Sequence, residues 1–312
     1  MYNTPILLIV FNRPEETKLV LTAIKKVKPK ILYIASDGPR FNNTKDDLLV
    51  NQVRDICNNI DWECNVQRLY QNLNMGCSLG PRSALSWFFS KEIEGVVLED
   101  DCLPNKDFFT YCELLLKHYR NDERVLNICG SNMGYLNENN QSYFFSRFMN
   151  MSGWATWRRS AEAIDYELKS WKNTKFRKYK TYKLLRTNFF DLDIGWYQYW
   201  YQKFNLTIDK EFISWWDWQW IYYQLNSKKL SIIPNKNLVT NIGFNNSATH
   251  TIDENNPLAN IPSESFDFPI SHPKKIIHNI EYEEYAVKWV WCYYKRTAKW
   301  IYLTNKIKSF LK

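Results

Sequence analysis

Short apolar runs alternate with amphipathic segments through the first 130 residues of the chain. The runs are rich in β-branched residues and bounded by turn residues, as in buried strands, whereas the segments between them repeat apolar positions at helical spacing. Strands are expected at Ile6–Phe11, Lys30–Ser36, Cys64–Tyr70, Gly95–Leu98 and Val125–Gly130, and helices at Thr17–Val27, 44–59, Arg82–Ser90 and Phe108–Tyr119. This alternation predicts an α/β fold with a mostly parallel sheet flanked by helices.

Two segments of the chain are predicted to lack regular structure. Asn72–Pro81 reads as a turn-rich loop, and residues 253–273, which are rich in Asn, Pro and Ser, read as a linker. From about 131 to 270 the pattern is irregular and dense in aromatic residues, with clusters at Ser152–Trp157 and Trp215–Trp218. We interpret this part as continuous with the first half.

Three carboxylates, Glu99, Asp100 and Asp101, follow the fourth predicted strand. Two like charges about 5 Å apart repel by about 3 kcal/mol at an effective dielectric of about 20. Solvent relieves this repulsion if the three acids form a water-facing loop, and a bound divalent cation relieves it better. Hard oxygen ligands of this kind suit Mg²⁺ or Mn²⁺, which commonly also bind a substrate diphosphate.

Other chemically distinctive residues also follow predicted strands. Arg13 comes after the first strand and Asp37 after the second. Because ligands of parallel sheets bind beyond the carboxyl ends of the strands, we expect Arg13, Asp37 and the three acids to share one edge. This shared edge favours the metal interpretation of Glu99–Asp101 over the solvated loop.

The composition restricts the class of protein. The 312 residues are 45% apolar and 24% charged, as expected of a folded globular chain, and aromatic residues reach 17%. The seven cysteines lack Cys-x-x-Cys spacing and are interpreted as reduced cytosolic thiols. The N-terminus lacks the basic region of a signal peptide, and no run reaches the roughly 18 apolar residues of a membrane span. We therefore expect a cytoplasmic protein.

The net charge of +8 is concentrated near the C-terminus. Residues 281–312 contain seven basic and three acidic residues, a net charge of +4. Residues 283–312 are predicted to form one basic amphipathic helix with flanking Trp and Tyr, which fits an anionic membrane surface. The alternative is a helix whose apolar face packs on the body of the protein. No nucleic-acid recognition motif accompanies the charge.

The sequence Val97-Leu98-Glu99-Asp100-Asp101-Cys102-Leu103-Pro104-Asn105-Lys106-Asp107-Phe108-Phe109 resembles the metal motif of GT-A fold glycosyltransferases. The resemblance covers about residues 5–250 and is nearest to N-acetylglucosaminyltransferase I and to bacterial haemolysin-like glycosyltransferases. It implies a GT-A (Rossmann-like) fold in which Asp101 binds Mn²⁺ (or Mg²⁺) and Glu99 and Asp100 contact the donor. We divide the chain into a nucleotide-sugar-binding part at 1–130, an acceptor-binding and catalytic part of the same domain at 131–270, and the C-terminal helix at 281–312.

Further segments resemble the family in the same order along the chain. Phe11-Asn12-Arg13-Pro14 is similar to the first nucleotide loop, and Ser36-Asp37-Gly38 to the segment whose Asp binds uracil. Ser152-Gly153-Trp154 resembles the segment lining the donor site, and Trp216-Asp217-Trp218 the one carrying the catalytic base. His250 ends a region resembling a late loop and is expected to contact metal or phosphate. Arg82 is a further candidate for donor binding. The first Asp of the family's Trp-Asp-Asp-Trp is Trp216 here, and residues 160–210 match nothing in the family.

Each candidate also has a plain structural interpretation. Asp217 could cap the start of a helix or pair with an Arg or Lys side chain. Asp37 could open an Asp-Gly-Pro turn, and Arg13 and Arg82 could be surface charges. His250 could be solvated, and Trp154 and Trp157 could be core residues rather than sugar platforms. The catalytic interpretation of Asp217 needs a general base near an acceptor hydroxyl, and we expect desolvation by Trp215, Trp216 and Trp218 to strengthen its basicity.

The expected function is metal-dependent, inverting transfer of a sugar from a nucleoside diphosphate, expected to be UDP, to a hydroxyl of a bacterial surface glycan or lipid-linked acceptor. Its location is expected to be cytoplasmic, with peripheral contact at the inner membrane face. Two alternatives are a non-catalytic, membrane-associated glycan-binding protein and a sugar nucleotidyltransferase. The latter class usually has a Gly-rich N-terminal loop, which is missing from Phe11–Pro14.

Overall fold

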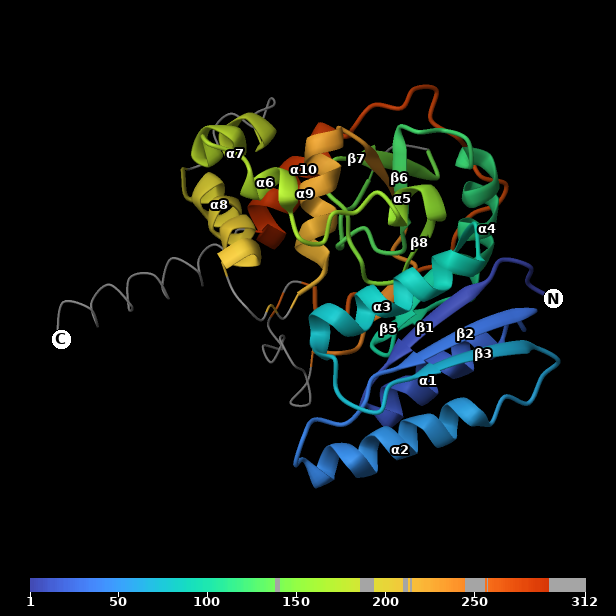
Figure 1. Cartoon of the computed structure of the whole chain (residues 1–312). Coiled ribbons are helices and arrows are strands. Elements are labelled where there is room, and N and C mark those ends of the chain that lie inside the picture. Colours follow the sequence, from blue (N-terminus) through green and yellow to red (C-terminus); the bar gives the residue numbers. More distant parts are fainter. Residues whose placement is uncertain are drawn as a thin grey trace.

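A computed structural model describes residues 1–137, 141–185, 194–209, 213, 215–244, 256 and 258–291. Its centre is an eight-stranded sheet in the order β3-β2-β1-β4-β8-β6-β9-β7 (Figure 1). The strands are β1 (Ile6–Val10), β2 (Ile31–Ser36), β3 (Asn65–Tyr70), β4 (Glu94–Glu99), β6 (Val125–Cys129), β7 (Tyr143–Ser146), β8 (Trp154–Trp157) and β9 (Leu230–Pro234). The five strands predicted in the first 130 residues are thereby confirmed.

The sheet is mostly parallel. β3, β2, β1 and β4 pair in parallel, as do β6 and β9, whereas β8 is antiparallel to both β4 and β6, and β7 is antiparallel to β9. A separate two-stranded sheet pairs β5 (Cys102–Pro104) with β10 (Val239–Asn241). The α/β fold with a mostly parallel sheet flanked by helices is therefore as predicted, and strands from both halves of the chain make up one sheet.

Alternate strand residues supply two cores, one on each face of the sheet. In β1, Ile6 and Leu8 pack against α1, α2 and α4, while Leu7 faces α3 and the later helices. The first face is covered by α1 (Pro14–Lys25), α2 (Thr44–Asn58) and α4 (Lys106–Tyr119). The second is covered by α3 (Gly76–Lys91), α5 (Arg158–Ala161), α6 (Lys169–Lys172), α7 (Arg177–Leu185), α8 (Ile194–Asp209), α9 (Asp217–Ser227) and α10 (Ile280–Tyr285). Burial of each large apolar side chain stabilises these layers by about 1.5–3 kcal/mol.

The helix α3 begins earlier than the pattern indicates. The segment Asn72–Pro81 is predicted as a loop, but α3 starts at Gly76 and contains Pro81. The N–H groups of Met75 and Gly76 donate to the two carboxylate oxygens of Asp37, at 2.8 and 3.0 Å. Asp37 thus satisfies the helix start from 39 residues away in the chain, and no local capping residue marks that start.

Described residues of the supposed linker are held against the body. The N–H of Phe266 donates to Asp107 Oδ2 at 3.0 Å, and that of Glu264 donates to the carbonyl of Asn237 at 2.7 Å. Phe266 is buried and lies edge-on to Tyr111, with ring centroids 5.0 Å apart. For residues 258–273 the linker prediction is therefore wrong, because backbone hydrogen bonds and a buried ring tie the segment down.

The described start of the C-terminal segment packs on the body. It comprises α10 and a π-helical turn at Ala286–Trp291, and it buries Tyr282, Val287 and Val290. Residues 292–312 lie outside the described residues. The structure therefore tests the prediction of one helix over 283–312 only for residues 283–291. For this part the packing alternative holds.

A buried ion pair fixes α10 to the sheet. Glu283 is fully buried and accepts from Arg147 Nη2 at 2.7 Å, from the Arg147 backbone N–H at 2.6 Å and from Ser146 Oγ at 3.2 Å. The ring of His278 lies 2.9 Å from the same carboxylate. These bonds satisfy a charge that would otherwise be costly to bury.

None of the helices formed by the described residues combines the length and the apolar character needed to cross a bilayer. The six described cysteines are all unpaired.

Candidate active site

The predicted shared edge is present at the carboxyl ends of the parallel strands. In the sheet register, Ile9 lies opposite Glu99 and Val10 lies opposite Ser36. The loops that follow β1, β2 and β4 therefore leave the sheet at the same edge. The chain builds outward from β1 to β2 and β3 on one side and places β4 on the other, so the crevice between the loops after β1 and β4 is a topological switch point.

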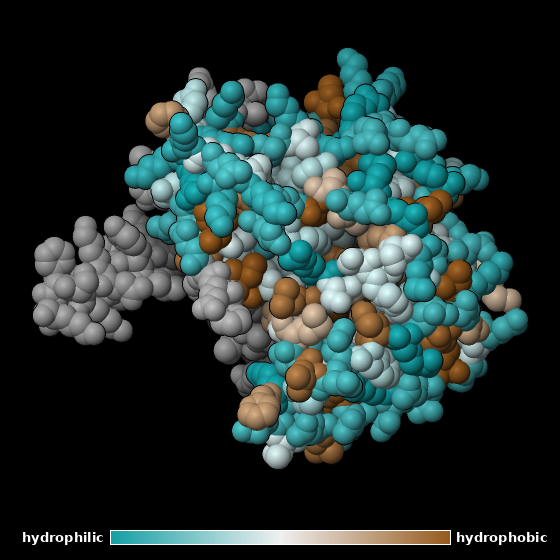
Figure 2. Space-filling view, in the orientation of Figure 1, coloured by the Kyte–Doolittle hydropathy of each residue, from teal (hydrophilic) through white to brown (hydrophobic). Residues whose placement is uncertain are grey.

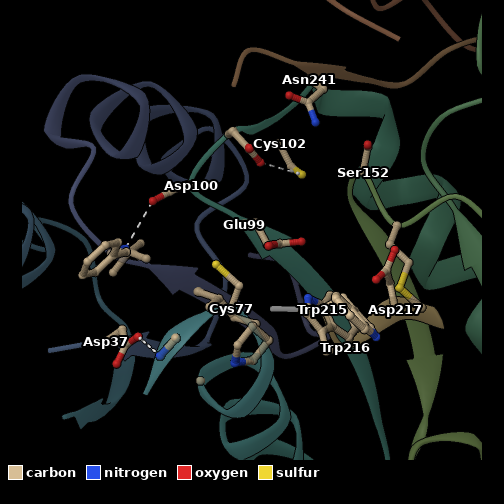
Figure 3. A pocket seen from close by; sticks show the side chains of 18 of the residues that line it. Asp37, Cys77, Glu99, Asp100, Cys102, Ser152, Trp215, Trp216, Asp217 and Asn241 are labelled. Carbon is tan, nitrogen blue, oxygen red and sulfur yellow. Dashed lines mark hydrogen bonds between the residues drawn. The ribbon is translucent and has the colours of Figure 1, made fainter. Parts of the chain in front are cut away.

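A cavity of about 760 Å³ opens at this edge, within the usual size range of ligand sites. Its walls come from the loops after β1, β2 and β4, the start of α3, the segment Met149–Ser152, and the helices α8 and α9. In Figure 3, Glu99 stands between Asp37 on one side and Asp217 on the other. Of the predicted site residues, Phe11, Arg13, Asp37, Glu99, Asp100, Asp101 and Asp217 line it.

Arg13 bridges two of the three acids. Its Nη1 atom lies 3.2 Å from Asp100 Oδ1 and 2.8 Å from Asp101 Oδ2. Asp100 also accepts from the backbone N–H of Phe11 at 3.2 Å. The loop after β1 and the acidic motif after β4 are thereby joined across the switch point by charge-assisted hydrogen bonds.

The acids remain crowded despite Arg13. Burial, then the negative charges of Asp101, Asp100 and Asp217, raise the pKa of Glu99 well above its ordinary value. Burial also raises the pKa of Asp100, and the guanidinium of Arg13 only partly offsets this. Such a cluster favours added positive charge, in the form of protons or a cation.

A late segment of the chain packs directly on Asp101. Strand β10 pairs with β5, and the N–H of Ile242 donates to the Asp101 carbonyl at 2.8 Å. Gly243 follows, and a Cβ atom there would lie 2.3 Å from Asp101 Oδ2 and 2.9 Å from its Cγ. Only a glycine leaves room for this carboxylate. Asn241 lines the cavity and accepts from the Gly243 N–H at 2.8 Å.

Asp37 lines the other end of the cavity, and its carboxylate is fully engaged. Oδ1 accepts from the N–H groups of Gly38 and Met75, both at 2.8 Å, and Oδ2 accepts from Gly76 N–H and Asn74 Nδ2, both at 3.0 Å. Burial raises the pKa of Asp37 while these backbone N–H groups oppose the rise. Four donors fill the roughly four lone-pair positions of a carboxylate. A ligand donor would therefore have to displace one of them, and the amide of Asn74 is the only side-chain donor among the four.

Asp217 is the first residue of α9 and enters the cavity beside an aromatic wall formed by Tyr199, Trp215 and Trp218. The rings of Trp215 and Trp218 stack with centroids 4.1 Å apart and planes inclined by 26°. Trp215 Nε1 donates to Thr207 Oγ1 at 2.9 Å, which fixes the wall to α8.

A lysine of α8 belongs to the same surface. Lys203 Nζ lies 3.8 Å from the ring centroid of Trp218 and 5.0 Å from that of Tyr199. Tyr199, Lys203 and Thr207 are four residues apart and therefore share one face of α8. This face of α8 therefore supplies Tyr199 and Lys203 to the aromatic wall and holds Trp215 through Thr207.

Gly153 and Trp154 lie behind the cavity wall. Gly153 has a φ of +66°, and its carbonyl accepts from Gly130 N–H at 2.8 Å. Trp154 is fully buried and stacks on Trp216, with ring centroids 6.1 Å apart. Trp157 is buried as well. Both tryptophans are therefore core residues, and Trp154 packs against Trp216, the residue before Asp217.

Arg82 is not brought to the site. Arg82 lies outside the cavity lining, with its guanidinium 5.0 Å from the Tyr166 ring centroid and 4.0 Å from Glu167. Because Pro81 and Gly80 face the cavity, the next position on the α3 helix turns away from it. His250 lies outside the described residues.

Sequence reasoning missed Lys203, Asn241 and Gly243. Lys203 is in the stretch 160–210 that resembled nothing, although its spacing from Tyr199 is helical. Gly243 is one of only nine glycines in the chain, a signal of a close backbone approach that carries no information about its partner.

Within the described residues, no group of three or more His, Cys, Asp and Glu side chains is arranged to hold a metal ion. This does not conflict with a metal that arrives with a diphosphate, because Mg²⁺ is commonly held by one or two carboxylates plus substrate phosphates and water. Asp101 supplies such a carboxylate at the cavity surface, and each of its oxygens retains a lone pair beside the contact with Arg13 Nη1 or Cys102 Sγ.

Comparisons with protein-family models and with curated proteins found no match. Similar solved structures include TarS 1–349 from S. aureus, with 13% identity, a TM-score of 0.33 and coverage of 53% of this chain and 50% of that chain. They also include mouse xyloside xylosyltransferase 1, with 10% identity, a TM-score of 0.32 and coverage of 72% and 82%. A third is 4-diphosphocytidyl-2C-methyl-D-erythritol synthase from Anaerococcus prevotii, with 10% identity, a TM-score of 0.32 and coverage of 73% and 99%. The chain thus spans half of the TarS chain, and likenesses this distant assign no function.

Proposed function

We propose that the protein is a metal-assisted, inverting glycosyltransferase. It moves a sugar from a nucleoside diphosphate, expected to be UDP, onto a hydroxyl of a bacterial surface glycan or lipid-linked acceptor. The observation that carries this proposal is the placement of Glu99–Asp101 at the switch point, in a cavity that Asp217 also lines. A substrate with a nucleotide at the Asp37 end and a sugar near Asp217 would put its diphosphate beside the acids.

Asp101 is the proposed metal ligand, and Glu99 and Asp100 are proposed to place the donor. A bound Mn²⁺ or Mg²⁺ would supply positive charge to the leaving diphosphate. Arg13 holds Asp100 and Asp101 in place from the opposite loop. His250 remains a proposed second contact to metal or phosphate.

Asp217 is the proposed general base. It would accept the proton of the acceptor hydroxyl while the acceptor oxygen bonds to the anomeric carbon. The bond from that carbon to the diphosphate oxygen breaks in the same step, and its electron pair leaves with the diphosphate. One displacement of this kind inverts the anomeric configuration.

The aromatic wall is the proposed acceptor surface. Trp215 and Trp218 are partly exposed in the cavity, and the ring surfaces that they do not turn toward each other or toward Lys203 suit the apolar side of a sugar ring. Because the wall adjoins Asp217, a sugar bound on it would have a hydroxyl near the base. The proposed location is cytoplasmic, with peripheral contact at the inner face of the membrane.

Release of UDP from candidate UDP-sugars in the presence of Mn²⁺ tests the proposal. The wild type should release UDP, and Asp101→Ala or excess chelator should abolish release. Release of pyrophosphate from a nucleoside triphosphate and a sugar phosphate would instead identify a nucleotidyltransferase. Glycan binding without any nucleotide chemistry would identify a non-catalytic binding protein.

A further inference from the structure

The segment Lys169–Leu185, which forms α6 and α7, carries an unusual concentration of positive charge. It contains seven basic residues and no Asp or Glu: Lys169, Lys172, Lys175, Arg177, Lys178, Lys180 and Lys183. It lies at the periphery of the fold, where the surface over α6 and α7 is mostly hydrophilic with isolated apolar side chains (Figures 1 and 2). A charge of +7 on one short segment favours an anionic partner.

Large aromatic side chains accompany this charge in solvent. Phe176 is 76% exposed, Tyr179 67% and Tyr182 40%. The carbonyl of Phe176 accepts from the Lys180 N–H at 2.9 Å, so Phe176 begins the first turn of α7. At 100° per residue the three aromatic residues and Lys183 fall within a sector of about 120°. One face of α7 is therefore both aromatic and basic.

The opposite face of α7 is fixed to the protein. Thr181 and Leu185 are buried. The guanidinium of Arg177 donates to the carbonyls of Trp171 and Lys172 at 3.2 and 2.8 Å, and to Asn205 Oδ1 on α8 at 3.2 Å. The exposed aromatic residues thus stand on a structured helix whose orientation is set.

We propose that this outer face of α7, formed by Phe176, Tyr179, Tyr182 and Lys183, docks on an anionic lipid membrane together with the exposed lysines that precede it, Lys172 and Lys175. Exposed lysines on and just before a helix that presents exposed aromatic rings match a charged headgroup layer above an apolar interior. None of the six side chains lines the cavity, and a protruding helix face suits a broad lipid surface better than a single bound strand or small anion. The docking surface does not depend on the proposed glycosyl transfer.

The position of α7 connects this surface to the active site. Arg177 and Trp171 both donate to Asn205 on α8, and another face of α8 presents Tyr199 and Lys203 to the cavity. A membrane bound at α7 therefore lies one helix away from the proposed acceptor surface. If the proposed function holds, this arrangement suits an acceptor that is anchored in lipid.

The test is sedimentation of the full chain with vesicles of phosphatidylglycerol and phosphatidylcholine, and with vesicles of phosphatidylcholine alone. Binding should require phosphatidylglycerol and weaken at high ionic strength. Each lysine near the surface contributes about a fivefold change in affinity, so Lys172→Gln/Lys175→Gln/Lys183→Gln should weaken binding about 100-fold. Phe176→Ser/Tyr179→Ser should weaken it at least about tenfold, because the rings no longer enter the interface.

The matched control is Lys18→Gln/Lys26→Gln/Lys45→Gln, which removes three exposed lysines from α1, from the residue after it and from α2. This control should bind vesicles as the wild type does. The proposal is overturned if the α7 lysine variant binds as tightly as the control, or if soluble glycerol phosphate or single-stranded RNA displaces the vesicles. Release of UDP, measured on the same variants without membrane, should be unchanged, so a failure of glycosyl transfer is read separately from a failure of docking.

Discussion

Substitution of Gly243 by alanine is the most specific test of the site geometry. The added methyl carbon would lie 2.3 Å from Asp101 Oδ2, 2.7 Å from its Cβ and 2.9 Å from its Cγ, whereas ordinary contact begins at 3.4 Å. The whole side chain of Asp101 must therefore shift by about 1 Å, or the backbone at Ile242 must give up its 2.8 Å bond to the Asp101 carbonyl. Overpacking of this kind costs about 1–3 kcal/mol of stability.

The expected effect on activity is larger than the effect on folding. A misplacement of about 1 Å in a positioned catalytic group costs about 100-fold in rate. We expect Gly243→Ala to lower kcat/KM for UDP release by about that factor and to raise the Mn²⁺ concentration needed for half-maximal activity. Far-UV circular dichroism should remain that of the wild type, because the three atoms nearest to the added methyl all belong to the side chain of Asp101.

Gly80→Ala is the matched control. It adds the same methyl group at the cavity wall, but the new carbon would lie 3.5 Å from Asp37 Oδ2, an ordinary contact distance. Because Gly80 is inside α3, alanine there should also favour the helix by up to about 1 kcal/mol. Wild-type kinetics and Mn²⁺ dependence in Gly243→Ala would refute the assignment of Asp101 as the metal ligand.

Three further outcomes follow from the described contacts. Asp217→Asn should abolish transfer while UDP binding by calorimetry stays within about twofold of the wild type, because the base meets the acceptor and not the nucleotide; joint loss of both would make Asp217 structural. Asp37→Ala should lower the free energy of unfolding in urea by about 1–3 kcal/mol, since it strands the N–H groups at the start of α3; an unchanged midpoint would contradict the capping role. Burial and the neighbouring His118 hold the pKa of His272 below its ordinary 6.5, so below pH 6.5 the unfolded state binds more protons, and stability is lost as the pH falls from 6.5 through the lower pKa of the folded protein. The slope of unfolding free energy against pH in this range should flatten in His272→Asn, and an unaltered slope would show that other groups cause it.

The periodicity of the chain predicts those helices and strands whose bounds depend on residues close to them in the sequence. The apolar runs of β1, β2 and β4 are visible in sequence, and parallel pairing then brings Arg13, Asp37 and Glu99–Asp101 to one edge. The start of α3 is different, because the group that caps it, Asp37, lies on another loop. The local sequence pattern contains no sign of such a distant partner. The sequence therefore predicts a loop up to Pro81, although the helix begins at Gly76.

The far wall of the site depends on contacts between residues that are far apart in the sequence. Gly243 reaches Asp101 because β10 pairs with β5, and Asp217 enters the cavity because buried Trp216 stacks on Trp154 of β8. The sequence suggests Asp217 only through its resemblance to a family motif. Trp154 shows that a motif match can identify a residue without identifying its role. Its segment resembles one that lines the donor site, but its side chain is buried in the core and supports the wall from behind.

The central claim is that Asp101 binds a divalent cation together with the diphosphate of a nucleotide. Calorimetric titration of UDP with and without Mn²⁺, into the wild type and Asp101→Asn, tests it most directly. The account predicts that Mn²⁺ tightens UDP binding to the wild type by at least about tenfold and leaves the affinity of Asp101→Asn unchanged. Equal UDP affinity with and without Mn²⁺ in the wild type, or a full Mn²⁺ effect in Asp101→Asn, would contradict the account.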